Sequence, residues 1–325
     1  MQSSASARSA VSRALLLAGA AISLPVFAAS TADTPEWIAK SNANAQVLVN
    51  SLAKNGPEFA GRIGVQGFDD KITDLNPGFE ERVRAELVAS HAELEKRILS
   101  ETDPMVRQDL QILVESAANQ LQTNALNKRL VLPYADITQL VFFGEFSLLD
   151  DQVDAARRPA ALARLKRYVG LEPGTKSVVE LVKARYIAQA AANPALLPPY
   201  KGEVEKHLTA IPRYSAGIRQ LYTKYGIDKL EGAPAALDAL DAQFKAYTEW
   251  LTTTVLPKAR TDYRLPAELY ADNLKNVGLD IPPQELMARA QLAFTEIRNE
   301  MKAIAPLGAS STALPTTTTA PSSRR

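Results

Sequence analysis

The sequence predicts an all-α fold of long antiparallel amphipathic helices, with little or no strand. Three observations support this prediction. Apolar residues recur at the helical spacings of three, four and seven over several long stretches. Prolines and capping residues stand where these stretches begin, and glycines stand where some of them end. Runs that alternate apolar and polar residues, as half-buried strands do, are scarce in the chain.

The apolar periodicity predicts four helices in particular. Their apolar faces run from Phe79 to Ile98, from Leu110 to Leu121, from Leu237 to Val255 and from Leu286 to Ile304. Residues three or four apart share one side of a helix, so each stretch forms a single apolar stripe. We expect the first three of these helices to bury their stripes. Part of the stripe from Leu286 to Ile304 is expected to be exposed, because no helix that could cover it follows in the sequence.

Capping residues, prolines and glycines predict where some helices begin and end. Asn76-Pro77 and Asp103-Pro104 each place a capping side chain before a proline at the first helical position. Gly170 and Gly226 follow helical runs and are interpreted as C-terminal caps.

Other segments are expected in connections, or leave the element type open. Pro198-Pro199 and Pro282-Pro283 are expected in connections or at helix starts, where the missing N–H removes no hydrogen bond from the helix. Leu130–Pro133 is the best candidate for extended chain, although Pro133 argues against a central strand. The apolar segment Ile137–Phe146 is predicted to be buried, as either helix or strand.

The N-terminus has the pattern of a secretory signal. Arg8 and Arg13 precede an apolar run from Ala14 to Leu24, and small residues around Ala28 fit a cleavage site. We therefore predict a signal peptide at residues 1–28 and a periplasmic or secreted location. The alternative is an uncleaved membrane anchor. After cleavage, no remaining stretch is apolar and long enough to span a membrane.

The rest of the chain is predicted to contain two regions. Residues 29–306 form the helical domain. Residues 307–325 are rich in Thr, Pro and Ser and carry almost no large apolar side chain, so we predict a disordered low-complexity tail.

Composition excludes some classes of function. The chain has 37 basic and 36 acidic residues and a net charge of +1, which argues against nucleic acid or an anionic membrane as a partner. It has no cysteine, so it forms no disulfide and offers no thiolate to a metal. The basic pairs Arg157-Arg158 and Lys166-Arg167 are interpreted as a solvated helix face.

The two histidines do not form a recognisable zinc motif. A zinc hydrolase needs ligands close together on one helix face, as in His-Glu-x-x-His. His91 and Glu95 are four residues apart and could hold a metal weakly, but a half-buried structural histidine is the favoured interpretation. His207 lies in a charged stretch and is interpreted as a solvated side chain.

Other catalytic patterns are also missing. Ser215 has no glycine two residues before it, so it is not in a nucleophile elbow. The glycines of Gly61–Gly67 lack the context of a phosphate-binding loop and are read as a loop between helices. Asp69-Asp70 and Asp150-Asp151 are interpreted as acids that precede helices and favour the helix dipole, rather than as acid/base or calcium sites. The sequence assigns no catalytic, cofactor-binding or metal-binding residue.

Several segments, taken in order, resemble the bacterial family called domain of unknown function 885. The resemblance covers roughly Thr34 to Ala305 and rests on order and spacing more than on any one motif. The segments that carry it are Gly64–Pro77, Ile211–Tyr214 leading into Tyr225-Gly226, Leu256–Arg260 and Tyr263–Tyr270.

This resemblance implies a further set of expectations. The family is similar to helical zinc metallopeptidases, is often exported and includes longer chains. Its metal motif, of the His-Glu-x-x-Pro-Gly-His type, lies in the second half, with an acidic ligand downstream. These positions do not occur here. The resemblance therefore implies an exported equivalent of the non-metal half of a zinc-dependent peptidase or hydrolase, with no activity alone and zinc only in full-length relatives.

Several alternatives stay open at this point. The chain could be a frameshifted fragment, the product of a split gene whose separately encoded C-terminal half is its partner, or a functional short protein. The rival function is a non-enzymatic periplasmic helical module for binding or interaction. A downstream reading frame that encodes the zinc motif would favour the truncated enzyme, and unrelated DNA would favour the module.

Overall fold

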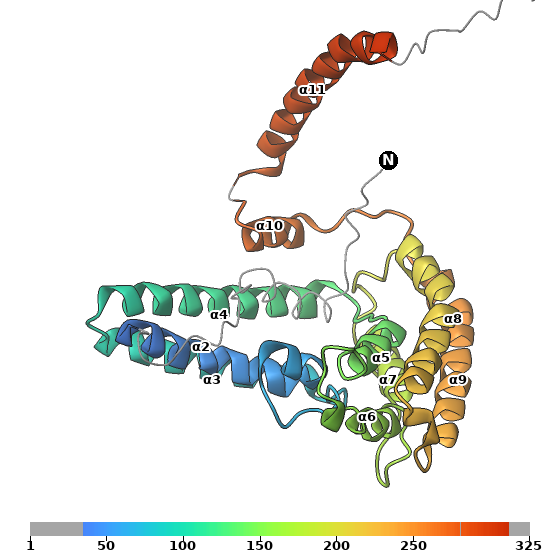
Figure 1. The fold of residues 1–325 in the computed structure, drawn as a ribbon. Helices are drawn as coiled ribbons and strands as arrows, with labels where there is room; N and C mark the ends of the chain where they lie inside the picture. Colours follow the sequence, from blue (N-terminus) through green and yellow to red (C-terminus); the bar gives the residue numbers. More distant parts are fainter. Residues whose placement is uncertain (1–34, 280, 312–325) are drawn as a thin grey trace, which may run out of the picture. The chain divides into compact units, whose positions relative to one another are not determined.

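The computed structural model describes residues 35–279 and 281–311 (Figure 1). Over these residues the fold is all-α, as the sequence predicts, and the only extended pairing consists of two isolated bridges. The chain divides into two compact units, one ending at Leu269 and the other beginning at Tyr270. The predicted signal peptide at residues 1–28 lies outside the described residues.

The first unit begins with a layer of three long helices, α2 (Glu36–Asn55), α3 (Phe79–Ser100) and α4 (Pro104–Leu130), which lie side by side (Figure 1). A three-residue connection joins α3 to α4, so these two helices are antiparallel. Asp103 caps α4 as predicted, because its carboxylate accepts hydrogen bonds from the N–H groups of Met105 and Val106. A small core joins the layer, with Leu94, Val106 and Leu110 fully buried.

A second group of helices surrounds the main core of the first unit. The helices α8 and α9 form an antiparallel pair, and α5 and α6 pack against them (Figure 1). The group consists of α5 (Ile137–Phe146), α6 (Ala160–Tyr168), α7 (Val178–Ala192), α8 (Lys201–Lys224) and α9 (Ala233–Trp250). Short helical turns stand between or after the helices of the first unit. They are η1 (Pro57–Ile63) after α2, η2 (Ala155–Arg157) after α5, η3 (Ile227–Lys229) after α8, and the π-turn η4 (Leu251–Val255) and η5 (Leu256–Lys258) after α9.

The segment Ile137–Phe146, which periodicity left undecided, is helix α5. The side chain of Asp136 caps it by accepting hydrogen bonds from the N–H groups of Thr138 and Gln139. Two predicted C-terminal glycines are also confirmed. Gly170 and Gly226 follow α6 and α8 with φ angles of 69° and 72°, a left-handed conformation that glycine adopts without a Cβ clash.

The predicted cap at Asn76-Pro77 is wrong by two residues. Helix α3 begins at Phe79, and Gly78 occupies the N-cap position. The reason is a local turn in which Asp74 Oδ1 accepts hydrogen bonds from both the backbone N–H and the side-chain amide of Asn76. This turn holds the Asn76 side chain away from the helix start.

The second unit contains most of α10 (Ala267–Asn276), which spans the division, and α11 (Pro283–Ser311). The predicted helix from Leu286 to Ile304 is confirmed, but it runs to Ser311, so residues 307–311 of the predicted tail are helical. The rest of that tail lies outside the described residues. Of the apolar stripe, Ile297, Met301 and Ile304 are exposed, in line with the expectation for this helix, and so are the neighbouring Met287 and Phe294.

Candidate functional site

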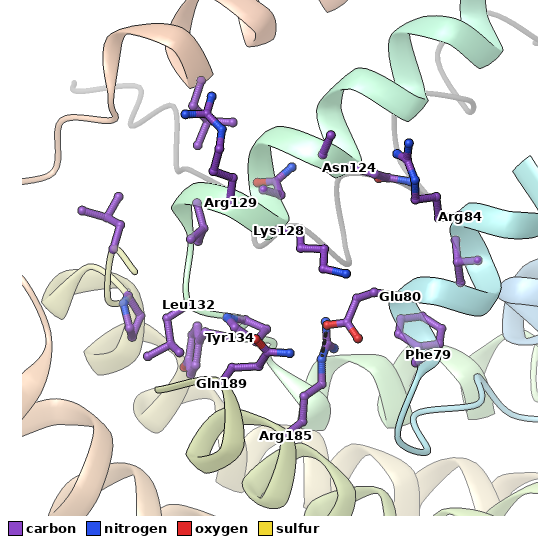
Figure 2. Close-up of a pocket in the computed structure, with 18 of the residues that line it drawn as sticks. Phe79, Glu80, Arg84, Asn124, Lys128, Arg129, Leu132, Tyr134, Arg185 and Gln189 are labelled. Atoms are coloured by element: carbon purple, nitrogen blue, oxygen red, sulfur yellow. Dashed lines mark hydrogen bonds and ion pairs between the residues drawn. The ribbon is translucent and has the colours of Figure 1, made fainter. Parts of the chain in front are cut away.

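The first unit contains a partly open pocket with a volume of about 650 Å³ (Figure 2). Helices α3 and α4 supply one wall. The chain that follows α4, from Val131 to Tyr134, and the chain that precedes α8, from Leu197 to Tyr200, supply another. Residues at the end of α2, Thr73, residues of α7 and α8, and Arg260, Leu265 and Leu269 also line it.

Extended segments beside the pocket are held by backbone hydrogen bonds. Leu197 accepts from the N–H of Leu132 at 2.9 Å and donates to the carbonyl of Leu130 at 2.8 Å. A second parallel bridge joins Tyr200 to Arg260. Proline disfavours helix in the residue before it and lacks an N–H, which explains why the chain stays extended at Pro133, Pro198 and Pro199.

The pocket has an apolar floor and a charged mouth. Leu87, Leu132, Tyr134 and Leu269 line it and are buried. The cationic side chains that line it from α3 and α4 are exposed. Figure 2 shows these cations, Arg84, Lys128 and Arg129, on one side of the pocket. Leu132, Tyr134 and Gln189 lie on the other side. The arrangement separates a surface suited to an apolar group from one suited to a negative charge.

Cations outnumber anions in the lining by five to two, and most of the cations have partners. Lys128 lies 2.6 Å from Glu81, and Arg129 lies 2.5 Å from Glu268, both as exposed ion pairs. Arg84 makes no ion pair or hydrogen bond with any residue that the structure describes. The charged lining residues are Arg84, Lys128, Arg129, Arg185, Arg260, Glu80 and Glu203.

Between α3 and α7, Glu80 and Arg185 form an ion pair inside the pocket (Figure 2). The Arg185 Nε donates to Glu80 Oε1 at 2.7 Å, and its guanidinium lies 5.5 Å from the centre of the Phe79 ring. Both charged side chains are less than a third exposed. This pair links α7 to the beginning of α3, so it fixes one edge of the pocket.

Behind the pocket, Tyr134 contacts His207 on α8. The tyrosine hydroxyl lies 2.7 Å from His207 Nδ1, and Nε2 of the same ring lies 3.8 Å from Asp136 Oδ2. Burial raises the pKa of Tyr134, and the charge of Asp136 raises it further. Burial lowers the pKa of His207, although Asp136 acts in the opposite direction there. Both shifts favour the neutral forms, in which the tyrosine O–H donates to Nδ1. The interpretation of His207 as a solvated side chain is therefore wrong, because its side chain is only 15% exposed.

A buried polar network connects η1 to the core beside the pocket. The carboxylate of Glu58 accepts hydrogen bonds from the backbone N–H and hydroxyl of Thr73, both at 2.7 Å, and from the Tyr168 hydroxyl at 3.1 Å. Thr73 itself lines the pocket. The network therefore holds a wall residue through a carboxylate that is almost fully buried.

The guanidinium of Arg164 occupies the middle of this region. It donates to the carbonyls of Gly144 and Phe68, at 2.6 and 3.1 Å, and to the Ser147 hydroxyl at 3.0 Å. Arg164 is 1% exposed, and its charge partly opposes the rise that burial causes in the pKa of the neighbouring Glu145 carboxyl. It joins α6 to α5 and to the loop after η1, three parts of the chain that the sequence analysis did not connect.

Glu145 is the second buried acid of the network. Its Oε2 accepts a hydrogen bond from the Tyr222 hydroxyl at 2.9 Å, while its Oε1 has no hydrogen-bond partner among the described residues. Complete burial raises its pKa to about 8, because an ionised carboxylate is poorly solvated there. At neutral pH the favoured form is the neutral acid.

The structure places the other sequence candidates apart from the pocket. His91 is half-buried, as expected, with Nδ1 3.4 Å from Glu95 Oε2. Ser215, on α8, donates a short hydrogen bond to Asp241, which also pairs with Arg219. The glycines of Gly61–Gly67 lie in η1 and the loop after it, as predicted.

The interpretation of the paired acids as helix-dipole partners is wrong. Asp69 accepts two hydrogen bonds of 2.8 Å from Arg157, and this contact lowers its pKa. Asp70 forms an ion pair with Arg167 at 2.8 Å. In the other pair, Asp151 interacts with Lys224 and Tyr225, and its neighbour Asp150 accepts from the N–H of Gln152 in a turn.

The basic pairs are likewise more than a solvated face. Arg158 stacks over the ring of Tyr225, 4.6 Å from its centre. Arg157 and Arg167 are half-buried in the ion pairs with Asp69 and Asp70. These contacts tie the loop after η1 to the second group of helices.

Two absences concern only the part of the chain that the structure describes. Over residues 35–279 and 281–311, no three His, Cys, Asp or Glu side chains are grouped so that they could hold a metal ion. Over the same residues, no helix has the length and apolar character needed to cross a membrane.

Comparison with known proteins relates the chain to one family. A search of curated proteins and a search of solved structures each returned no match. The model of a family described as bacterial protein of unknown function matches residues 57–316, which include most of the pocket lining and the buried network. The chain therefore belongs to this family, DUF885.

Proposed function

We propose that this chain is a binding module whose pocket takes up a small molecule with a largely apolar body. The observation that carries the proposal is the pocket in the first unit, with its volume of about 650 Å³ and its buried apolar floor. Ligand sites commonly have volumes of roughly 300 to 1,000 Å³ and are lined mainly by apolar groups. Removing such a ligand from water supplies the binding free energy.

Contacts around the pocket support a preformed site. The backbone bridges at Leu197 and Tyr200, the ion pair between Glu80 and Arg185, and the bonds from Glu58 to Thr73 each fix a different wall. A site whose walls are already ordered loses little conformational entropy when its ligand binds.

A neutral apolar fluorescent dye, N-phenyl-naphthylamine, tests the proposal. Ala125 lines the pocket on an exposed part of α4, so Ala125→Trp should fill the mouth without disturbing the core. Ala118→Trp is the matched control, because Ala118 is exposed on the same helix and does not line the pocket. We expect saturable binding by the wild type that is weakened at least about tenfold by Ala125→Trp only. Binding that both variants leave unchanged, or the absence of saturable binding, would refute the proposal.

A second candidate function rests on the resemblance to helical zinc peptidases. In this proposal the chain is exported and forms the non-metal part of such a hydrolase, and its pocket contributes to substrate binding. The basic and apolar N-terminal pattern, with Arg13 before the run from Ala14 to Leu24, supports export. Hydrolysis would require metal ligands beyond those that residues 35–279 and 281–311 provide. Mass spectrometry of the mature N-terminus, after expression in a bacterium, tests whether residues 1–28 are removed.

A further inference from the structure

We propose that the ligand of this pocket is an amphiphilic anion, whose apolar chain lies on the floor while Arg84 binds its carboxylate or phosphate group at the mouth. This inference rests on the proposed binding function and adds the chemical class of the ligand. It starts from the charges that line the pocket, where five cationic side chains face two acidic ones.

The contacts of these cations single out Arg84. Lys128, Arg129 and Arg185 are each held by an acidic side chain. Arg260 donates to the carbonyls of Pro198, Asp262 and Arg264 and so holds its own loop. Arg84 has no such partner among the described residues, although Glu80 lies one helical turn away, because Glu80 is paired with Arg185.

The surroundings of Arg84 suit an anion. It projects from α3 toward the wall formed by α4, whose pocket-lining positions Gln120, Asn124 and Lys128 repeat every four residues and carry no acid (Figure 2). The side-chain amide of Gln120 donates to Asn124 Oδ1 at 2.9 Å, so the two amides are held in place. A guanidinium binds carboxylate or phosphate oxygens through two parallel N–H···O bonds, which is a geometry that a lysine cannot reproduce.

The position of the apolar floor defines the other end of the ligand. Val83 precedes Arg84 on α3 and Leu87 follows it by one helical turn, and Leu132 and Leu269 continue the apolar surface into the pocket. A ligand with its charge at Arg84 can therefore keep the charge near water while its hydrocarbon part is buried. A ligand charged at both ends would have to bury one charge on this floor, which is unfavourable.

The experiment compares decanoate, decyl phosphate and uncharged decanol, with binding measured by displacement of the neutral dye. We expect the wild type to bind the anions at least about tenfold more tightly than decanol, with a smaller preference at high salt. The ratio between decanoate and decyl phosphate shows whether the natural head group is a carboxylate or a phosphate.

Three variants assign the effect to Arg84. Arg84→Gln should lower anion affinity to the level of decanol and leave decanol binding unchanged, and Arg84→Lys should recover only part of the loss. The control Arg62→Gln removes another exposed arginine without an ion pair, outside the pocket, and should change nothing. Equal melting temperatures are expected, because both arginines are exposed.

Each remaining outcome has a distinct meaning. Equal wild-type affinity for decanol and the anions would overturn this inference while leaving the proposed binding function intact. An anion preference that survives in Arg84→Gln would overturn the assignment to Arg84. If neither decanol nor the anions displace the dye, this inference fails. The proposed binding function fails only if the dye itself does not bind saturably, or if Ala125→Trp leaves its binding unchanged.

Discussion

Glu145 should make the stability of this protein depend on pH in a way that one substitution removes. The carboxyl is completely buried, and its pKa is raised from 4.5 to about 8. A raised pKa means that the folded protein prefers the protonated acid. This contribution to stability is fully present below pH 4.5 and is lost as the pH rises through 8.

The magnitude follows from the size of the shift. The difference between 4.5 and 8 is 3.5 pKa units, which at about 1.4 kcal/mol per unit corresponds to a loss of about 5 kcal/mol above pH 8. By pH 7 about 3 kcal/mol of this is already lost. Domains have free energies of unfolding of about 5 to 15 kcal/mol, so the effect is a large part of the total.

Glu145→Gln isolates this effect. Glutamine keeps the shape of the side chain and an oxygen that can accept from Tyr222, but it does not titrate. We expect wild type and variant to have similar free energies of unfolding at pH 5, and the variant to be the more stable by several kcal/mol at pH 9. Urea unfolding at pH 5, 7 and 9 measures the difference. Other groups that titrate, such as His207, are common to both proteins and cancel.

The control is Glu115→Gln, at an exposed glutamate on α4 whose carboxylate accepts a hydrogen bond from Gln111. It should follow the wild type at every pH. Parallel changes in the free energies of unfolding of wild type and Glu145→Gln from pH 5 to 9 would refute the reasoning, because they would show that Glu145 does not change its charge in the folded protein within this range.

Three further predictions concern other parts of the chain. Asp103→Ala should lower the free energy of unfolding by about 1 kcal/mol through loss of the α4 cap, and urea titration would show it. The chain should bind no equimolar zinc, since its two histidines are far apart and the described residues group no three His, Cys, Asp or Glu side chains; tight zinc in elemental analysis would contradict this and point first to His91. Phe294→Ser should reduce the binding of an apolar dye to the exposed apolar side chains of α11, and it should reduce association of chains as measured by light scattering. Dye binding and association equal to those of the wild type would contradict this prediction.

Helices were the most predictable part of this molecule because they depend on local patterns. The apolar stripes beginning at Phe79 and Leu286 and the cap at Asp103 each involve residues within a few positions of one another. The cap at Asn76 failed for an equally local reason, since Asp74 competed for the same side chain. A short turn and a helix cap use the same residue types, so sequence alone does not decide between them.

The buried network was missed because its members are far apart in sequence. Glu58 meets Tyr168 across 110 positions, and Tyr222 meets Glu145 across 77. One signal was nonetheless present. Glu145 is the only charged residue in the apolar segment Ile137–Phe146, and an acid in such a run is either buried with partners or exposed by a break in the pattern.

The pocket illustrates the same limit for exposed residues. Helical periodicity separates the buried stripe of α3 from its polar side, but it does not show which polar residue faces a cavity. The sequence does not show that Arg84 lacks an acidic partner. This follows from the tertiary structure, in which Glu80 pairs with Arg185 and the amides of α4 line the pocket with Arg84. The cation without a partner is thus a consequence of how other residues pair, and anion binding at the pocket would use a charge that folding leaves unneutralised.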